Sequence, residues 1–125
     1  MSAEELKEDI YGEDELPELA LVAMQVVIDA GDARIMSEQA LKKLHSFDFA
    51  GAEELIQKAF TQLNKAHNAQ TDVIQSEAAG KKYENSFLFN HAQDTMMNAM
   101  TQCNLTREII RLYKILYEEI QKKNC

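Results

Sequence analysis

The sequence has no tryptophan, only one proline and only four glycines, so residues that interrupt helices are scarce. It is rich instead in alanine, leucine, glutamate, glutamine, lysine and methionine, which all favour helices. The apolar fraction is 46%, and a chain of 125 residues is long enough to form one domain with its own core. The composition therefore predicts an all-α domain rather than a disordered chain.

Other absences exclude whole classes of protein. No apolar run approaches the roughly 18 to 20 residues that a membrane span needs, and the first residues lack the layout of a signal peptide. We therefore expect a cytoplasmic protein without membrane insertion. The two cysteines, Cys103 and Cys125, form no C-x-x-C pair, which argues against a zinc site or a disulfide framework. The net charge of −8 without a basic cluster argues against nucleic acid as a partner.

The negative charge is concentrated at the start of the chain. Residues 1–16 contain seven acidic residues and a single lysine, and they show no apolar stripe. Such a segment cannot bury enough apolar surface to fold by itself. The sequence therefore predicts a disordered acidic extension over residues 1–16 and a helical domain over residues 17–125.

The spacing of apolar and small residues predicts three long helices, at about residues 17–44, 49–79 and 86–122. In each segment these residues recur at alternating intervals of three and four. On the third segment the predicted stripe consists of Leu88, Ala92, Thr95, Ala99, Gln102, Thr106, Ile109, Tyr113, Leu116 and Ile120. Because the connections are short, the helices must pack as an antiparallel up-down-up bundle, and the seven-residue repeat predicts a left-handed supercoil.

The two connections contain the residues expected at helix ends. Ser46 or Asp48 can cap the start of the second helix, and Asn85 or Ser86 can cap the third. Gly80 is well suited to follow the end of the second helix.

The third helix carries more apolar surface than two neighbours can cover. Its additional apolar residues are Phe87, Phe89, Met96, Met97, Met100, Leu105, Ile110, Leu112 and Ile115. A surplus of this size predicts that part of the helix is buried by another subunit.

A polar stripe runs through the same helix. At about 100° per residue, Asp94 lies about 60° to one side of His91 and Thr95 about 40° to the other. A carboxylate in apolar surroundings needs a cation, a hydrogen-bond network or a raised pKa. His91 has three possible roles on this pattern: a core histidine with a satisfied hydrogen bond, a metal ligand together with Asp94, or a nucleophile that carries a phosphoryl group. The spacing leaves all three open.

Several self-contained active sites are missing from the sequence. It has no phosphate-binding G-x-x-x-x-G-K-[ST] loop, no G-x-G-x-x-G turn, no G-x-S-x-G elbow and no H-E-x-x-H zinc motif. The other two histidines, His45 and His67, fit a helix end and a helix surface.

The segment HAQDTMMNAM, residues 91–100, resembles the H-A-Q-D-H-L-M-x-x-M block of the lactose/cellobiose-type IIA components of the bacterial sugar phosphotransferase system. AGDARIMSEQAL on the first helix is similar to the G-x-A-R segment of that family. FDFAGAEELI and KAHNAQTDVIQ are similar to its second helix. The resemblance covers roughly residues 18–120, with the same order and spacing.

The resemblance implies a fold, a reaction and a set of partners. It implies a three-helix bundle that assembles as a homotrimer. His91 would accept a phosphoryl group on its Nε2 (tele) nitrogen from the phosphocarrier HPr and pass it to a cysteine of a IIB component. The IIC component would couple this transfer to the uptake of a disaccharide of the cellobiose, chitobiose or lactose type. The three copies of Asp94 would share one Mg²⁺ per trimer.

The chain departs from the family at Thr95, where the family usually has a second histidine. A threonine hydroxyl can still donate a hydrogen bond to a phosphate oxygen, and Gln93 can do the same. Two alternatives stay open, and the departure at Thr95 bears on the second. One is a histidine phosphotransfer domain of two-component signalling, although Asp94 and Thr95 replace the lysine and glycine typical of those domains. The other is a noncatalytic helical trimeric adaptor that has lost transfer.

Overall fold

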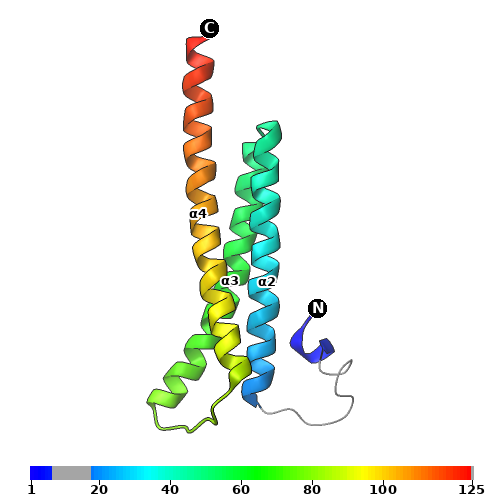
Figure 1. Cartoon of the computed structure of the whole chain (residues 1–125), viewed down its shortest axis with the longest axis vertical. Coiled ribbons are helices and arrows are strands. Elements are labelled where there is room, and N and C mark those ends of the chain that lie inside the picture. The colour runs from blue at the N-terminus through cyan, green and yellow to red at the C-terminus, as the bar shows by residue number, and fades with distance from the viewer. Residues whose placement is uncertain (7–17, 125) are drawn as a thin grey trace.

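The computed structural model describes residues 1–6 and 18–124, and all the regular structure in these residues is helical. Its long helices are α2 (Glu18–Lys43), α3 (Phe49–Ala78) and α4 (Phe87–Lys123), with the short 3₁₀ helix η1 (Leu44–Ser46) between α2 and α3. Figure 1 shows α2 and α4 running in one direction and α3 in the other, and each long helix packs against the other two. The all-α prediction is confirmed, and the predicted helix bounds are correct to within one residue.

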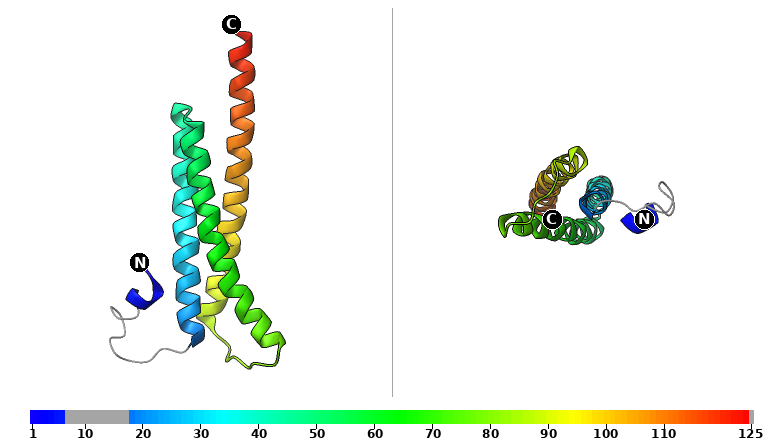
Figure 2. Two further views of the ribbon diagram at one scale, coloured as in Figure 1. Left: turned by 180° about the vertical axis from the view of Figure 1, so that it is seen from behind. Right: turned by 90° about the horizontal axis from the view of Figure 1, so that it is seen from below.

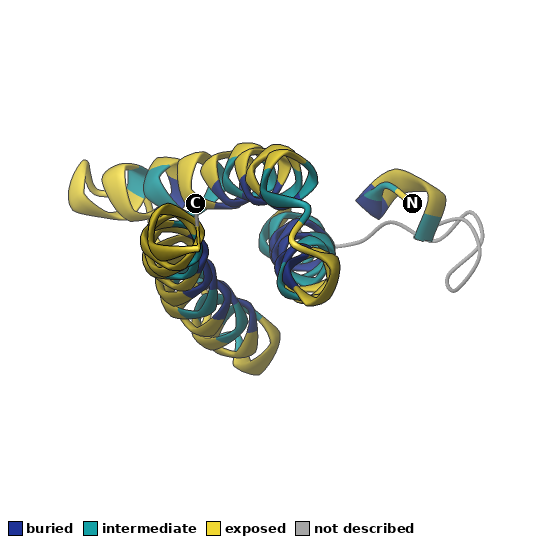
Figure 3. Cartoon of the chain, turned by 90° about the horizontal axis from the view of Figure 1, so that it is seen from above, coloured by how far each residue is buried: buried dark blue, intermediate teal, exposed yellow. Residues whose placement is uncertain are grey.

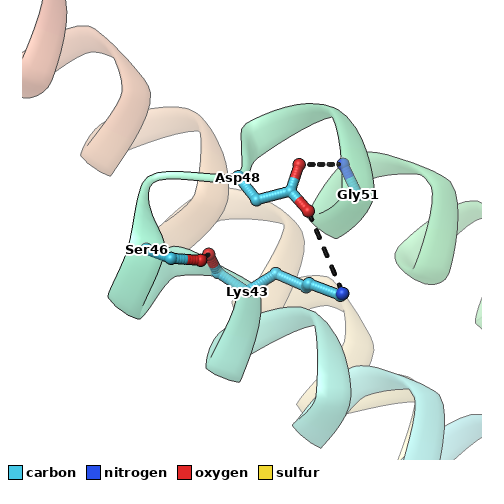
Figure 4. A network of polar contacts seen from close by, with 4 residues as sticks. All are labelled: Lys43, Ser46, Asp48 and Gly51. Carbon is cyan, nitrogen blue, oxygen red and sulfur yellow. Dashed lines mark hydrogen bonds and ion pairs between the residues drawn. The ribbon is translucent and has the colours of Figure 1, made fainter.

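The connection between α2 and α3 is fixed by a short network of polar contacts (Figure 4). Asp48 is the N-cap of α3, because its carboxylate accepts a hydrogen bond from the Gly51 backbone N–H at 2.9 Å. A Cβ atom at Gly51 would collide with this carboxylate, so a larger residue there would displace Asp48 from its capping position. Ser46, the other candidate cap, donates instead to the Lys43 carbonyl at 3.3 Å.

Gly80 follows the end of α3, as the sequence predicted, and begins the connection to α4. Gly80 has a φ of +107°, and the Lys81 N–H reaches back to the Ser76 carbonyl at 3.0 Å, as in a Schellman motif. Ser86 is the N-cap of α4 and accepts from the Phe89 N–H at 3.0 Å. Of the two predicted caps for this helix, Ser86 is therefore the one used.

The core between the three helices consists mostly of alanines with a few larger side chains. Its fully buried members are Ala23, Val26, Ala30, Ala33, Ala40, Leu44, Ala52, Ile56, Ala59, Leu63, Ala66, Ala92, Met96, Ala99, Cys103 and Ile110. The stripes predicted for the first two helices coincide with this core except near their ends. Because most of these side chains are small, the helix axes can approach closely where these residues meet.

The stripe predicted for the third helix is wrong at every second position. The prediction placed Thr95, Gln102 and Ile109 in the core, whereas the buried residues of α4 are Ala92, Met96, Ala99, Cys103, Thr106 and Ile110. At these positions the buried residue is the next one along the chain, about 100° further around the helix, and because the alternate positions are shared the stripe as a whole is turned by about 50°. Both choices keep the seven-residue spacing. The structure buries the one that includes Met96 and Cys103, which are less polar than Thr95 and Gln102.

Two buried polar contacts join α2 to α4 within this core. The hydroxyls of Ser37 and Thr106 lie 2.7 Å apart, and both side chains are buried. Cys103 Sγ lies 3.7 Å from the Ala33 carbonyl oxygen, and burial raises the pKa of the Cys103 thiol. Buried hydroxyls must find a partner, so this pairing fixes the rotation and register of α4 against α2.

The far end of α4 continues beyond the ends of α2 and α3 (Figures 1 and 2). Aromatic stacking connects it to the turn after α2. The ring centroid of Phe47 lies 5.9 Å from that of Tyr113 and 4.8 Å from that of Tyr117, and Phe49 packs on both tyrosines. Phe47 has a φ of 59°, a left-handed conformation that is uncommon for a bulky residue, and its stacking helps to hold it there.

Much of α4 is exposed (Figure 3), and the apolar surplus predicted for the third helix lies largely on these exposed residues. The exposed large apolar residues of α4 are Phe87, Leu88, Met97, Leu105, Ile109, Leu112, Ile115, Leu116 and Ile120. Met96 and Ile110, which were expected in the same group, belong instead to the core.

Residues 7–17 and Cys125 lie outside the described part of the chain, so the predicted disorder stays a prediction for residues 7–16. Residues 3–6 are described and are helical. None of the helices in the described ranges is long and apolar enough to cross a membrane.

Candidate functional site

The first residue of the HAQD block, His91, lies in the second turn of α4 and its side chain is exposed. The neighbouring Ala92 is fully buried, so the helix turns its small residue to the core and the imidazole outward. The interpretation of His91 as a core histidine is therefore wrong. Within residues 1–6 and 18–124 no hydrogen bond or ion pair engages its ring, so both ring nitrogens can meet a partner.

His91 faces the side of α4 that is next to α2. Gln102 lies eleven residues later, which brings it back to within about 20° of His91 around the helix. The Gln102 amide contacts Arg34 of α2: its Oε1 accepts from Arg34 Nε at 3.3 Å, and its Nε2 donates to the Arg34 carbonyl at 3.5 Å. The flank that carries His91 is thus the one that meets α2.

Gln93 lies on the opposite flank and faces α3. It lines a cleft of about 190 Å³ together with Ile74 and Glu77 of α3 and with Asn90, whereas His91 does not line this cleft. Residues two positions apart are about 160° apart around a helix, so they do not face each other. The structure therefore does not bring Gln93 to the imidazole of the same chain.

Thr95 is half-buried and its hydroxyl donates a hydrogen bond to the His91 backbone carbonyl at 2.9 Å. The hydroxyl proton is thus used within the helix. It would have to leave this carbonyl before it could donate to a phosphate oxygen near His91. The predicted role of Thr95 stays a prediction.

Asp94 is exposed on the side of α4 that faces away from the core. No ion pair or hydrogen bond to its side chain occurs in the described ranges. In the same residues, no group of three or more His, Cys, Asp or Glu side chains is placed to hold a metal ion. One carboxylate cannot bind Mg²⁺ tightly, so the predicted site needs further carboxylates, such as those of the other subunits in a trimer.

Lys81, in the turn before α4, is held by other contacts and is not a free charge beside His91. Lys81 forms a hydrogen-bonded ion pair with Glu18 at 2.9 Å and lies over the Tyr83 ring at 5.0 Å from its centroid. The hydrogen bond to Glu18 raises the pKa of Lys81. These contacts tie the turn before α4 to the start of α2.

One buried acid, Asp29 on α2, was not predicted from the sequence, and it is only 7% exposed. Burial raises the pKa of the Asp29 carboxyl, and a hydrogen bond from Gln25 Nε2 at 3.1 Å opposes this rise. It lies three residues after Val26 and four before Ala33, both of the core, and this spacing could have indicated that it faces inward. It lies on the far side of α2 from His91 and is not part of the candidate site.

Comparison with known proteins matches residues 21–114 to the family described as PTS system, Lactose/Cellobiose specific IIA subunit. The chain is 39% identical to the lactose-specific EIIA component of Lacticaseibacillus casei, over 81% of this chain and 90% of that protein. It is 38% identical to the lichenan-specific phosphotransferase enzyme IIA component of Bacillus subtilis, over 82% of this chain and 93% of that protein.

Solved structures give the same result. The cellobiose-specific enzyme IIA of Bacillus anthracis superposes with a TM-score of 0.77 at 39% identity, covering 83% of this chain and 95% of that one. The chitobiose IIA in a complex with HPr gives 0.71 at 33% identity, covering 82% and 99%. The chain is thus a component of a sugar phosphotransferase system. More narrowly, it belongs to the lactose/cellobiose-specific IIA subunit family.

Proposed function

We propose that this chain is a phosphoryl carrier, in which His91 accepts a phosphoryl group from HPr and delivers it to a cysteine of a IIB component. The IIC component then takes up a disaccharide of the cellobiose, chitobiose or lactose type. The observation that carries the proposal is the exposed imidazole at the first position of the HAQD block, which no described residue engages, in a chain of this family. The similar chitobiose IIA has been solved in a complex with HPr, which supports HPr as the donor.

Phosphoryl transfer requires the protein mainly to position the reacting groups and to stabilise the charge on the phosphoryl oxygens. The lone pair of His91 Nε2 attacks the phosphorus in line, the N–P bond of phospho-HPr breaks, and its electron pair returns to the HPr imidazole. In the second step a cysteine thiolate of IIB forms the S–P bond as the N–P bond at His91 breaks. The net charge of −8 implies that both partners bring positive surface to this face. All of this takes place, in this proposal, in the cytoplasm.

A homotrimer built on α4 is the second part of the proposal. Asp94, Leu105 and Leu112 lie within about 20° of one another around the helix, and Leu112 is 63% exposed. If three copies of α4 pack through this stripe, the leucines bury one another and the three Asp94 carboxylates converge on the axis. This accounts for the exposed apolar surface of α4, which two neighbours within the chain leave uncovered.

The three carboxylates would repel each other, and Mg²⁺ fits them because it prefers oxygen ligands. Asp94 of each subunit would hold the ion, which would supply charge compensation at the axis when bound. Its role in this proposal is in assembly rather than in transfer.

The same arrangement gives Gln93 a role. Around α4, His91 lies about 60° to one side of Asp94 and Gln93 about 100° to the other. With Asp94 at the axis, the His91 flank of one subunit meets the Gln93 flank of the next. The amide of Gln93 would then approach the phosphoryl group on a neighbouring subunit's histidine, whereas within one chain the two side chains point apart.

The proposal is tested by incubating the chain with phosphoenolpyruvate, the general phosphotransferase enzyme and HPr. We expect about one acid-labile phosphate per chain, formed only when HPr is present. Transfer that does not need HPr would contradict the proposal. No incorporation at all would leave the noncatalytic adaptor as the better account, with Thr95 as the reason to suspect it.

A further inference from the structure

Helix α2 carries two apolar stripes on opposite sides. The inner stripe enters the core through Ala23, Val26 and Ala30. The outer stripe repeats at intervals of three and four and consists of Leu21, Met24, Ile28, Gly31 and Ile35. At about 100° per residue, Met24 points about 160° away from Val26, and therefore away from α3 and α4. A surface helix normally has only one such stripe, so we expect another segment or another chain to cover the outer one.

Burial along the outer stripe is uneven. Met24 is only 8% exposed, although it faces away from the other two long helices. Ile35, three turns further along the same stripe, is 54% exposed. Something therefore covers the stripe near Met24 and stops before Ile35.

The first residues of the chain lie at this place. Figure 3 shows them beside α2, on the side away from α4. Ala3 is only 3% exposed, and its backbone N–H donates to Gln25 Oε1 at 2.8 Å. Gln25 is the residue next to Met24, so this hydrogen bond places residues 1–6 at the covered part of the stripe.

The segment is held in a helical turn by its own side chains. Ser2 Oγ accepts from the Glu5 N–H at 3.2 Å, and Glu5 Oε2 accepts from the Ser2 N–H at 2.8 Å. These reciprocal contacts form a capping box, and the Leu6 N–H completes the turn by donating to the Ser2 carbonyl at 3.1 Å. A segment that is already shaped loses less entropy when it docks.

The acceptor on α2 is held in one orientation. Gln25 Nε2 donates to Asp29 Oδ1 at 3.1 Å, so the amide has its oxygen left for the Ala3 N–H. Because the Asp29 carboxylate is only 7% exposed, few other hydrogen-bond donors can reach it. Asp29 thus positions Gln25 as an acceptor for the segment.

We propose that the outer stripe of α2 around Met24 is a docking surface for the chain's own N-terminal turn, residues 1–6. The hydrogen bond from the Ala3 N–H to Gln25 holds the turn in place. The turn covers an apolar face through which copies of the chain could otherwise associate. Self-association is thereby confined to α4. This inference does not depend on the chemistry of His91.

The test measures the oxidation of individual methionines by hydrogen peroxide, followed by peptide mass spectrometry. In the wild type Met24 should react slowly, close to the rate of Met96, which is 1% exposed. In Ala3→Glu and in Gln25→Ala, Met24 should react about tenfold faster relative to Met96, the change expected for the loss of one buried contact. Glu4→Ala is the matched control, because Glu4 is exposed, and it should leave the ratio unchanged.

Two results would overturn the proposal. If Met24 stays protected in both Ala3→Glu and Gln25→Ala, another segment or a second copy covers the stripe. A second copy is identified by protection that disappears when the wild type is diluted. Sedimentation tests the second part: Ala3→Glu should form species heavier than the wild type, and an unchanged mass distribution would show that the turn does not limit self-association.

Discussion

At the scale of single residues, the positions in the HAQD block have different surroundings although they are adjacent in the sequence. His91 and Asp94 are exposed, Gln93 faces α3, and Thr95 uses its hydroxyl on the His91 carbonyl. The motif could predict which residues to consider, because residue types and spacing are visible in the sequence. It could not predict the flank on which each one lies, because that depends on how α4 is rotated against α2.

Asp29 gives a prediction about pH. Burial raises the pKa of its carboxyl above the ordinary value of 3.8, so the folded state binds this proton more readily than the unfolded state. Its contribution to the free energy of unfolding therefore falls as the pH rises from 3.8 through the raised pKa. Above the raised pKa the folded state bears the full cost of burying a charged carboxylate. Asp29→Asn should thus unfold at a higher temperature than the wild type at pH 7.

The advantage of Asp29→Asn should shrink as the pH is lowered toward 3.8, because the wild-type carboxyl is then protonated as well. Asn keeps an oxygen that can accept from Gln25 Nε2, so the substitution tests charge rather than the hydrogen bond. Thermal unfolding followed by circular dichroism across this range measures the effect. A variant that is less stable than the wild type at pH 7, or a difference that does not depend on pH, would contradict the interpretation.

At the scale of helices, the sequence predicted the existence, bounds and ends of the three long helices better than the rotation of α4 about its own axis. Heptad spacing and the signals at Asp48, Gly80 and Ser86 depend on local chemistry, and the structure uses all three. The rotation of α4 depends on a long-range choice between two stripes with the same spacing. Thr106 belongs to both stripes, so its contact with Ser37 does not decide between them. The stripes differ in whether Met96 and Cys103 or Thr95 and Gln102 are buried, and the structure buries the less polar pair. The outer stripe of α2 was missed because one apolar stripe already accounted for that helix.

The Ser37–Thr106 contact yields a prediction for the α2–α4 packing. Thr106→Val keeps the shape of the side chain but leaves the buried Ser37 hydroxyl without this partner. We expect a loss of about 1 to 3 kcal/mol in the free energy of unfolding, measured by urea denaturation. Ser37→Ala combined with Thr106→Val should recover part of this loss, because neither position then buries an unpaired hydroxyl. Additive losses in the double variant would show that the contact does not couple the two helices.

At the scale of the whole molecule, the main feature is an uncovered apolar stripe along α4 that continues onto the part of the helix beyond α2 and α3 (Figure 1). The family match ends at residue 114, whereas α4 continues to Lys123. The exposed Ile115, Leu116 and Ile120 lie in this continuation. An assembly through α4 would therefore bury apolar surface over the whole length of the helix.

The trimer proposal predicts a mass. Sedimentation equilibrium at micromolar concentration should give three times the chain mass of 14.2 kDa. Leu112→Glu should shift the protein to monomers, because three carboxylates would then replace three leucines near the axis. Ile35→Glu is the matched control, since it also replaces an exposed apolar side chain but lies on α2, and it should stay trimeric. A monomeric wild type, or a trimer that survives Leu112→Glu, would contradict assembly through this stripe.

The measurement that tests the central claim most directly is the site of phosphoryl incorporation from phospho-HPr. We expect His91→Ala to abolish acid-labile phosphate incorporation while His45→Ala and His67→Ala retain it, since all three histidines are exposed but only His91 begins the HAQD block. Mass spectrometry under alkaline conditions should find the phosphate on the peptide that contains residue 91. Incorporation that persists in His91→Ala, or that is lost in His45→Ala or His67→Ala with the fold intact, would contradict the assignment of His91 as the carrier.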